Sequence, residues 1–220
     1  KPNYAAIQNE LRMFGIEDRK IISVDISDTE DLHNRVFEQL GIEPKERTPI
    51  AKLQAQVVDK LCVLCNVELD AAIEICRDAT FVMSRTGRIR NVIDSGGVHL
   101  FSPRLAEGGI SLTADGARKL HALRNVPVPD GFNSADKTLH SGSGPAWVMI
   151  DDDAEPFVKE GRNVMHGFIL ACDSWVRPGE SVLIVNSAGK LVAIGRSQAT
   201  SGEMESFSKG IAVKVREGCP

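Results

Sequence analysis

The sequence has few aromatic residues, few cysteines and no long apolar run. Aromatic side chains make up 5% of the 220 residues, and no apolar stretch approaches the roughly 20 residues needed to cross a bilayer. Residues 1–9 lack the apolar centre of a secretory signal. The five cysteines are scattered and odd in number, which argues against a disulfide framework. The sequence therefore predicts a cytoplasmic protein with reduced thiols and no membrane partner.

Several motifs of catalysis and nucleotide binding are also missing. The sequence has no Walker motif, no GxGxxG after a predicted strand and no Gx[ST]xG nucleophile elbow. Cys62 and Cys65 have the CxxC spacing of zinc and redox sites, and Cys76 could add a third ligand, but no fourth is evident. Because the pair lies in an apolar helical run, buried core cysteines are the favoured interpretation. We expect no catalytic residue, metal or cofactor.

Three consecutive acidic residues, 151–153, form the other candidate metal site. Successive residues of a strand point to opposite faces of the sheet, so the three carboxylates could not converge on one ion. A solvated strand end is therefore the preferred interpretation.

The formal net charge is −4, which taken alone argues against a nucleic-acid partner because Lys and Arg neutralise phosphates. The charge is unevenly distributed. Residues 82–125 hold seven basic against three acidic side chains, and residues 159–220 hold eight against six, whereas residues 126–158 hold one against six. This distribution is compatible with one basic face, and equally with a mixed surface.

The pattern of the first 124 residues predicts an α+β arrangement. Residues 1–47 are expected to form a mixed N-terminal region of unknown role. It has a helix at 1–15, a strand at 20–26 and a second helix that Ser27 or Thr29 could cap and that runs to Gly41. Thr48 and Pro49 are a helix start. From there to residue 124 we expect a small α+β module, with its helices at 48–64, 68–78 and 113–124 and its strands at 81–84, 88–93, 98–102 and 110–112.

Residues 125–145 are rich in Pro, Asp, Ser and Gly and are expected to be a linker. Residues 146–220 then show short strands at 146–150, 163–172, 181–186, 191–197 and 211–216. Thr200 and Glu203 have the spacing of a capping box, which predicts a short helix before the last strand. This succession predicts a compact β-barrel.

Two segments are candidates for phosphate binding. In the first, a turn at Thr86 and Gly87 would bring Arg85, Arg88 and Arg90 together, with Arg88 and Arg90 on one side of a strand. In the second, residues 159–164, a helix is expected to end at a glycine before the next strand. Further basic residues could lie beside this second segment if the final strands pack there: Lys190, Arg196, Lys209, Lys214 and Arg216.

The C-terminal segment resembles the PUA domain, a small RNA-binding pseudo-β-barrel. The resemblance rests on DDAEPFV (152–158), EGRNV (160–164), VRPGESVLIVN (176–186), LVAIG (191–195) and GIAVKVREG (210–218). Ahead of it, SRTGRIRNV (84–92) and LTADGARKLH (112–121) are similar to the module that precedes the PUA domain in archaeal archaeosine tRNA-guanine transglycosylase. In that family a zinc-bearing catalytic barrel exchanges a guanine in tRNA, and this sequence contains no counterpart of that barrel.

The resemblance implies that the PUA domain grips the acceptor stem and 3′ end of tRNA. By position, it implies RNA-facing roles for Gly161, Arg162, Asn163 and Val164, and for Lys214 and Arg216. Together with the composition-based candidates, the expected RNA-binding set is Arg85, Arg88, Arg90, Lys119, Gly161, Arg162, Asn163, Val164, Lys190, Arg196, Lys209, Lys214 and Arg216.

Three functions are compatible with these observations. The first is a non-catalytic tRNA-binding subunit for archaeosine modification, acting with a separate transglycosylase barrel. The second is a ribosome-associated translation factor that contains a PUA domain. The third is an enzyme whose activity resides in the N-terminal half, which zinc bound at Cys62, Cys65 and Cys76 would support.

Overall fold

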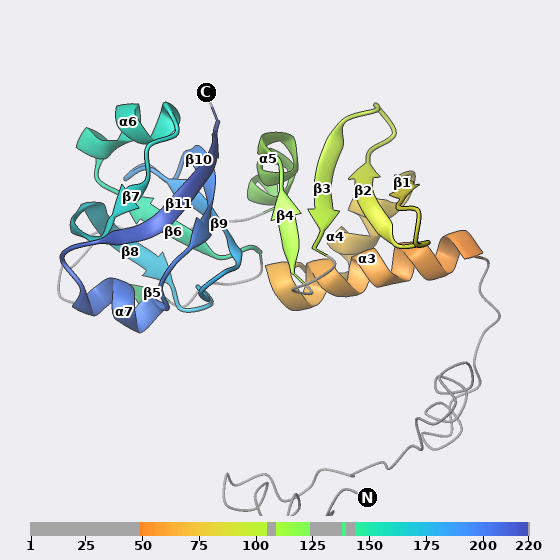
Figure 1. Ribbon diagram of the computed structural model, residues 1–220, viewed down its shortest axis with the longest axis horizontal. Coiled ribbons are helices and arrows are strands. Elements are labelled where there is room, and N and C mark those ends of the chain that lie inside the picture. The colour runs from red at the N-terminus through yellow and green to blue at the C-terminus, as the bar shows by residue number, and fades with distance from the viewer. Residues whose placement is uncertain (1–48, 105–108, 124–137, 140–143, 220) are drawn as a thin grey trace, which may run out of the picture. The chain divides into compact units, whose positions relative to one another are not determined.

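The computed structural model describes residues 49–104, 109–123, 138–139 and 144–219. The helices and strand expected within residues 1–47 lie outside this part of the chain. Two helices come first, α3 (Pro49–Cys65) and α4 (Leu69–Cys76), as the sequence predicted (Figure 1). Val57, Leu61 and Cys65 recur every four residues on α3 and are buried, so one stripe of the helix faces the core.

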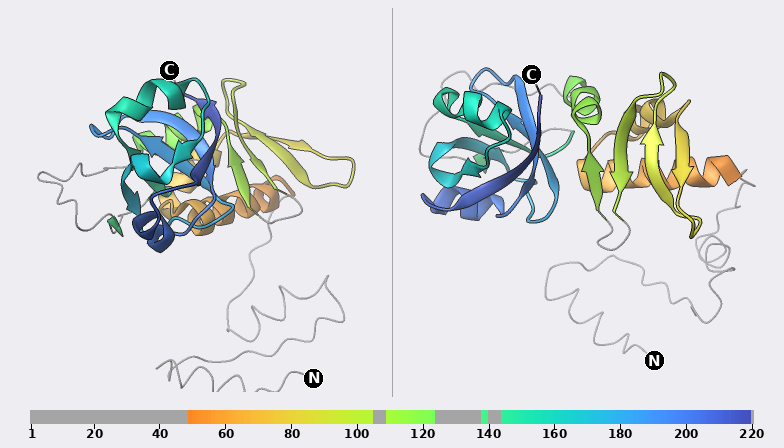
Figure 2. Two further views of the ribbon diagram at one scale, coloured as in Figure 1. Left: turned by 60° about the vertical axis from the view of Figure 1, so that its left-hand side comes forward. Right: turned by 45° about the horizontal axis from the view of Figure 1, so that its top comes forward.

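A four-stranded antiparallel sheet follows in the order β1-β2-β3-β4. Its strands are β1 (Thr80–Met83), β2 (Ile89–Ile93), β3 (His99–Pro103) and β4 (Ile110–Leu112). Val92 pairs with Phe101, and Phe101 pairs with Leu112. This buried row belongs to the same apolar core as α3 and α4, and Figure 2 shows both helices on one face of the sheet. The opposite face is therefore free to carry polar side chains.

Helix α5 (Ala114–Ala122) closes this module at the position that the sequence predicted. The Thr113 side chain accepts a hydrogen bond from the Gly116 amide, which satisfies one of the free N–H groups of the first turn. The name "sheet module" below means α3, α4, β1–β4 and α5.

The C-terminal part is a curled seven-stranded sheet in the order β5-β8-β6-β9-β10-β11-β7 (Figure 2). Its strands are β5 (Thr138–Leu139), β6 (Trp147–Ile150), β7 (Val164–Met165), β8 (Ile169–Asp173), β9 (Ser181–Val185), β10 (Leu191–Ser197) and β11 (Ile211–Gly218). Two 3₁₀ turns, η1 (Asp152–Ala154) and η2 (His166–Phe168), and two helices, α6 (Glu155–Lys159) and α7 (Ser201–Ser206), connect them. The α+β class and the C-terminal barrel are thus confirmed.

The single strand predicted over residues 163–172 is wrong. Strand β7 pairs with β11, whereas β8 pairs with β6 and β5. Because β7 and β8 lie near opposite edges of the curled sheet, the chain must turn a corner between them, and η2 makes that corner. The His166 ring turns inward there and packs edge-on against Phe207, with 5.4 Å between the ring centroids.

The acidic run at 151–153 follows the end of β6, with Asp152 and Asp153 exposed as expected, and it also begins the helical turn η1. The Asp151 side chain accepts from the Asp153 amide and caps η1. The Asp152 carboxylate accepts from the amide and the hydroxyl of Ser187, at 3.1 and 2.7 Å, and so ties η1 to the β9–β10 turn. Alternation along a strand does not apply to these three residues, because β6 ends at Ile150.

Within the predicted linker, Thr138 and Leu139 form β5, which runs parallel to β8; the remaining residues up to 143 lie outside the described chain. Residues Pro49–Pro220 form one compact unit. One apolar cluster contains residues of the sheet module together with Leu183, Leu191 and Ile194 of the barrel. The division of this unit into two domains stays a prediction. Among the described residues, no helix combines the length and apolar character needed to cross a membrane.

Candidate nucleic-acid interface

The junction between α6 and β7 has the geometry that its glycine predicts. Gly161 donates to the Val158 carbonyl and Arg162 donates to the Phe157 carbonyl, both at 3.0 Å. Gly161 has a φ of 90°. These two bonds and the left-handed residue form a Schellman ending, in which glycine avoids the steric cost of a positive φ. The chain therefore leaves α6 sharply and carries Arg162 and Asn163 onto the surface.

A pocket of about 220 Å³ lies beside this turn. It is lined by Ala154, Phe157, Val158, Arg162, Asn163, Val164, Met165 and Phe168. Ala154, Val158 and Val164 are buried and form its apolar base. Phe157 and Phe168 remain 56% and 46% exposed, although both are large and apolar. Exposed aromatic rings beside an arginine suit a flat, negatively charged ligand, because rings stack and the guanidinium pairs with phosphate.

Strand β11 runs beside β7, whose residues help to line this pocket. It pairs with β7 through Val213 and Val164, and the Asn163 Oδ1 atom accepts from the Val215 amide at 3.2 Å. Lys214 and Arg216 flank Val215 and are both exposed. We call Phe157, Arg162, Asn163, Met165, Phe168, Lys214 and Arg216 the barrel site. Lys209 is exposed in the turn between α7 and β11.

The three arginines of the sheet module surround a hairpin between β1 and β2. Ser84 and Arg88 close this hairpin, the Gly87 amide donates to the Ser84 carbonyl at 3.1 Å, and Gly87 has a φ of 72°. Arg85, Arg88 and Arg90 are exposed, as expected. We call these three residues the arginine turn.

The pairing of β1 with β2 is irregular beside the arginine turn. Arg88 precedes β2, and Arg90 is a bulge residue, because Val82 pairs with Asn91 while Met83 pairs with Ile89. A bulge inserts one unpaired residue and reverses the alternation beyond it. Ile89 is buried between the exposed Arg88 and Arg90, and their shared side of the strand stays a prediction.

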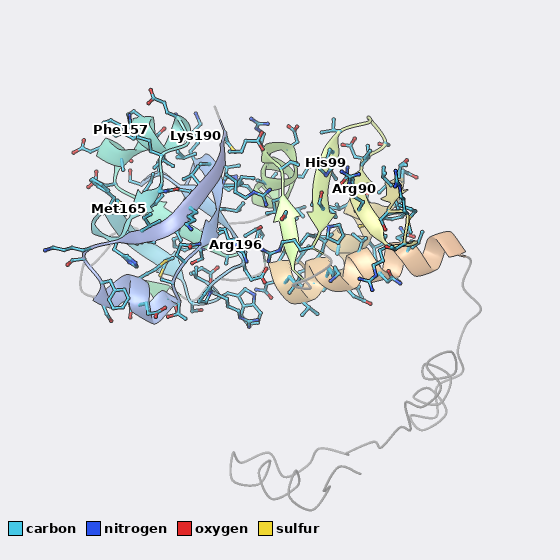
Figure 3. The ribbon with its side chains drawn as sticks, in the orientation of Figure 1. Arg90, His99, Phe157, Met165, Lys190 and Arg196 are labelled. Atoms are coloured by element: carbon cyan, nitrogen blue, oxygen red, sulfur yellow. The ribbon has the colours of Figure 1, made fainter. Side chains whose placement is uncertain are left out.

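The side chains of two of the other predicted residues have partners within the protein. The Lys119 Nζ atom lies 2.6 Å from the Asp94 Oδ2 atom, and the Arg196 Nε atom donates to the Gly179 carbonyl at 2.8 Å. Lys190 is exposed, and Figure 3 shows Arg196 away from Phe157 and Met165. The Val164 side chain is 1% exposed, so it supports the pocket from the core.

Sequence reasoning missed the exposed apolar side chains of the barrel site, Phe157, Met165 and Phe168. Nothing in the local pattern distinguishes them from core residues, because their exposure follows from the η2 corner and the α6 ending. The signal that could have found them is an aromatic residue two to four positions ahead of the glycine that ends α6.

The cysteines of the sheet module are core residues by position. Cys65 and Cys76 are buried, and burial raises the pKa of each thiol to about 12. Burial also raises the pKa of Cys62, which is partly exposed on α3. In the described ranges, no three His, Cys, Asp or Glu side chains are grouped closely enough to hold a metal ion.

Comparison with known families identifies two modules in tandem. Residues 146–219 match the PUA domain, and residues 70–127 match the patch-forming domain C2 of tRNA-guanine transglycosylase. Both modules expected from the sequence are thus confirmed, in the expected order.

The curated relatives are archaeal tRNA-guanine(15) transglycosylases. The chain is 34% identical to the Thermococcus onnurineus protein over 145 residues, which are 66% of this chain and 22% of that protein. It is also 34% identical to the Methanocaldococcus jannaschii protein over 151 residues, 69% of this chain and 20% of that protein. The chain therefore spans about a fifth of the length of these relatives.

A solved structure shares the fold. A hypothetical protein of Pyrococcus horikoshii superposes with a TM-score of 0.54 and 19% identity, covering 76% of this chain and 90% of that protein.

Proposed function

We propose that this chain binds tRNA and serves a tRNA-guanine transglycosylase as its non-catalytic tRNA-binding part. The observation that carries the proposal is the tandem of C2 and PUA modules, which matches archaeal enzymes whose names specify tRNA as substrate. A separate polypeptide with the catalytic barrel performs the base exchange, and the complex works in the cytoplasm.

The barrel site takes the single-stranded 3′ end of the acceptor arm. Phe157 and Phe168 supply exposed ring faces, and stacking on an aromatic side chain contributes about 1–3 kcal/mol per base. Arg162, Lys214 and Arg216 supply positive charge beside them. Stacking tolerates any base and phosphate pairing reads no sequence, so this site recognises an exposed end by its chemistry rather than by its sequence.

The arginine turn contacts a second stretch of phosphates. Its three guanidinium groups stand on an exposed hairpin, and an A-form stem presents phosphates and 2′-hydroxyls that are recognised mainly by shape. Two separated contacts on one molecule favour a folded tRNA over an isolated strand.

The first experiment measures binding to a full tRNA transcript and to the same transcript without its 3′ end, at several salt concentrations. We expect tighter binding to the intact tRNA, weakened by salt. The double variant Arg162→Ala with Lys214→Ala should lower the salt slope by about 0.7–0.9 for each lost phosphate contact. The matched control is Arg77→Ala, because Arg77 is an exposed arginine paired with Glu74 on α4. An unchanged slope in the double variant would reject the barrel site.

The second experiment tests the role in modification. The chain is mixed with a purified transglycosylase catalytic barrel, and incorporation of labelled guanine into tRNA is measured with and without the chain. Stimulation that depends on Arg162 supports the accessory role. Binding to the small ribosomal subunit without stimulation would instead favour a translation factor.

A further inference from the structure

Among the described residues, the polar contacts that cross from the sheet module to the barrel include four that involve a side chain. Three of them join a side chain to a backbone group: Ser181 Oγ donates to the Ile110 carbonyl at 2.8 Å, the Ala114 amide donates to Glu217 Oε2 at 3.1 Å, and the His121 Nε2 atom lies 2.9 Å from the Gly189 carbonyl. The fourth involves Arg104, directly after β3. Together with the shared apolar cluster, these contacts form what we call the junction.

Arg104 makes the most extensive of these contacts. Its Nη1 atom donates to the Gly179 carbonyl at 2.8 Å, and its Nη2 atom donates to Glu180 Oε2 at 3.0 Å. The Arg196 Nε atom donates to the same Gly179 carbonyl at 2.8 Å. The side chains of Arg104 and Glu180 are 17% and 28% exposed, so solvent screens this pair less than an ordinary surface ion pair.

Backbone hydrogen bonds hold both Arg104 and Gly179 in place. The Arg104 amide donates to the Gly109 carbonyl at 2.7 Å, which closes the β3–β4 connection. Gly179 donates to the Ser197 carbonyl at 2.8 Å and has a φ of 83°, which directs its carbonyl toward the two arginines. The planar guanidinium fork therefore meets two acceptors in a fixed arrangement, and small rotations of one module against the other would break it.

The Arg104 contact also requires a glycine at position 109. A Cβ atom at position 109 would lie 2.0 Å from the Arg104 Nη2 atom and 2.7 Å from its Cζ atom. Any side chain there must displace the guanidinium, although the charge of Arg104 would remain.

We propose that Arg104 is a positioning residue that fixes the sheet module against the barrel, so that the arginine turn and the barrel site engage one RNA at a set spacing. This inference rests on the proposed RNA-binding function. When two sites share one rigid body, binding at the first raises the effective concentration of the second, and a loose joint loses that gain. Arg104 and Arg196 thus act on RNA through the junction rather than through direct contact.

The test compares Arg104→Ala and Gly109→Ala, with Arg77→Ala as the control far from the junction. Each protein is titrated with full-length tRNA and with a short acceptor minihelix that reaches the barrel site alone. We expect both junction variants to bind tRNA about tenfold more weakly and to bind the minihelix with little change. Loss of folded protein would weaken the binding of both RNAs equally. The ratio of the two affinities therefore distinguishes an effect on module positioning from an effect on stability.

A second measurement follows the junction without RNA. The Ala114 amide bonds to Glu217 across the junction, so its hydrogen exchange reports junction opening. The Ala114 amide should exchange faster in both junction variants, and its exchange rate should be unchanged in the control. Unchanged exchange in both variants, or an unchanged ratio of the tRNA and minihelix affinities in variants that remain folded, would overturn the inference. If the wild-type protein binds neither RNA, the proposed function fails, while Ala114 exchange still decides whether Arg104 holds the junction.

Discussion

Two exposed glycines of the barrel should respond oppositely to the same substitution. Gly161 ends α6 with a φ of 90°, whereas Gly202 lies inside α7 (Ser201–Ser206) and has no positive φ. A Cβ atom built on either one meets nothing within 4 Å. Steric crowding is therefore excluded at both positions, and the backbone conformation alone decides the outcome.

The expected magnitudes follow from that conformation. Gly161→Ala places a Cβ atom in a left-handed residue and should lower the free energy of unfolding by about 1–2 kcal/mol. Gly202→Ala removes backbone entropy from the unfolded chain and should raise it by about 0.5–1 kcal/mol. A difference of roughly 2 kcal/mol corresponds to about 4–8 °C in Tm for a domain of this size.

The assay is thermal unfolding followed by circular dichroism, with urea unfolding as the check on free energy. Gly161→Ala should also weaken tRNA binding, because the Schellman ending places Arg162 beside the pocket. Gly202→Ala should leave binding unchanged. If both substitutions shift Tm in the same direction, the assignment of Gly161 as an obligatory left-handed residue is wrong.

Three further predictions concern acid stability, thiol reactivity and stacking. Hydrogen bonds from the Thr200 amide and hydroxyl lower the pKa of Glu203. The ionised Glu203 therefore stabilises the folded protein fully above the unfolded pKa of about 4.3, and this contribution is lost as pH falls through the lowered pKa. Glu203→Gln should make the fall of Tm in acid less steep. Cys65 and Cys76, each with a pKa of about 12, should resist iodoacetamide at pH 8 until urea unfolds the protein, as read by mass spectrometry; labelling of the native protein would contradict their burial. Phe157→Ala should weaken tRNA binding by about 1–3 kcal/mol without changing the salt slope, and a changed slope would show that the ring does not act by stacking.

Local signals predicted the helices of this protein well. Thr113 caps α5, and Thr200 with Glu203 forms the capping box of α7, because each partner lies three residues from the other. Gly161 ends α6 for an equally local reason. Capping bonds and turn conformations involve neighbours along the chain, so the sequence carries them in full.

Contacts that the sequence did not predict involve distant partners. Asp152 binds Ser187, and Arg196 shares the Gly179 carbonyl with Arg104 from another module. Arg90 became a bulge residue through its pairing with β1. Spacing along the chain does not reveal which basic side chains will bond to groups on distant strands.

The sequence by itself determined the class of fold, the order of the C2 and PUA modules and the positions of most helices and strands. These properties depend on periodicity, capping and turn residues, which act over a few positions. Only the tertiary structure decided which cation lines the pocket, which aromatic rings stay exposed and which arginines share the Gly179 carbonyl. Those outcomes depend on how the curled sheet brings residues from distant parts of the chain together.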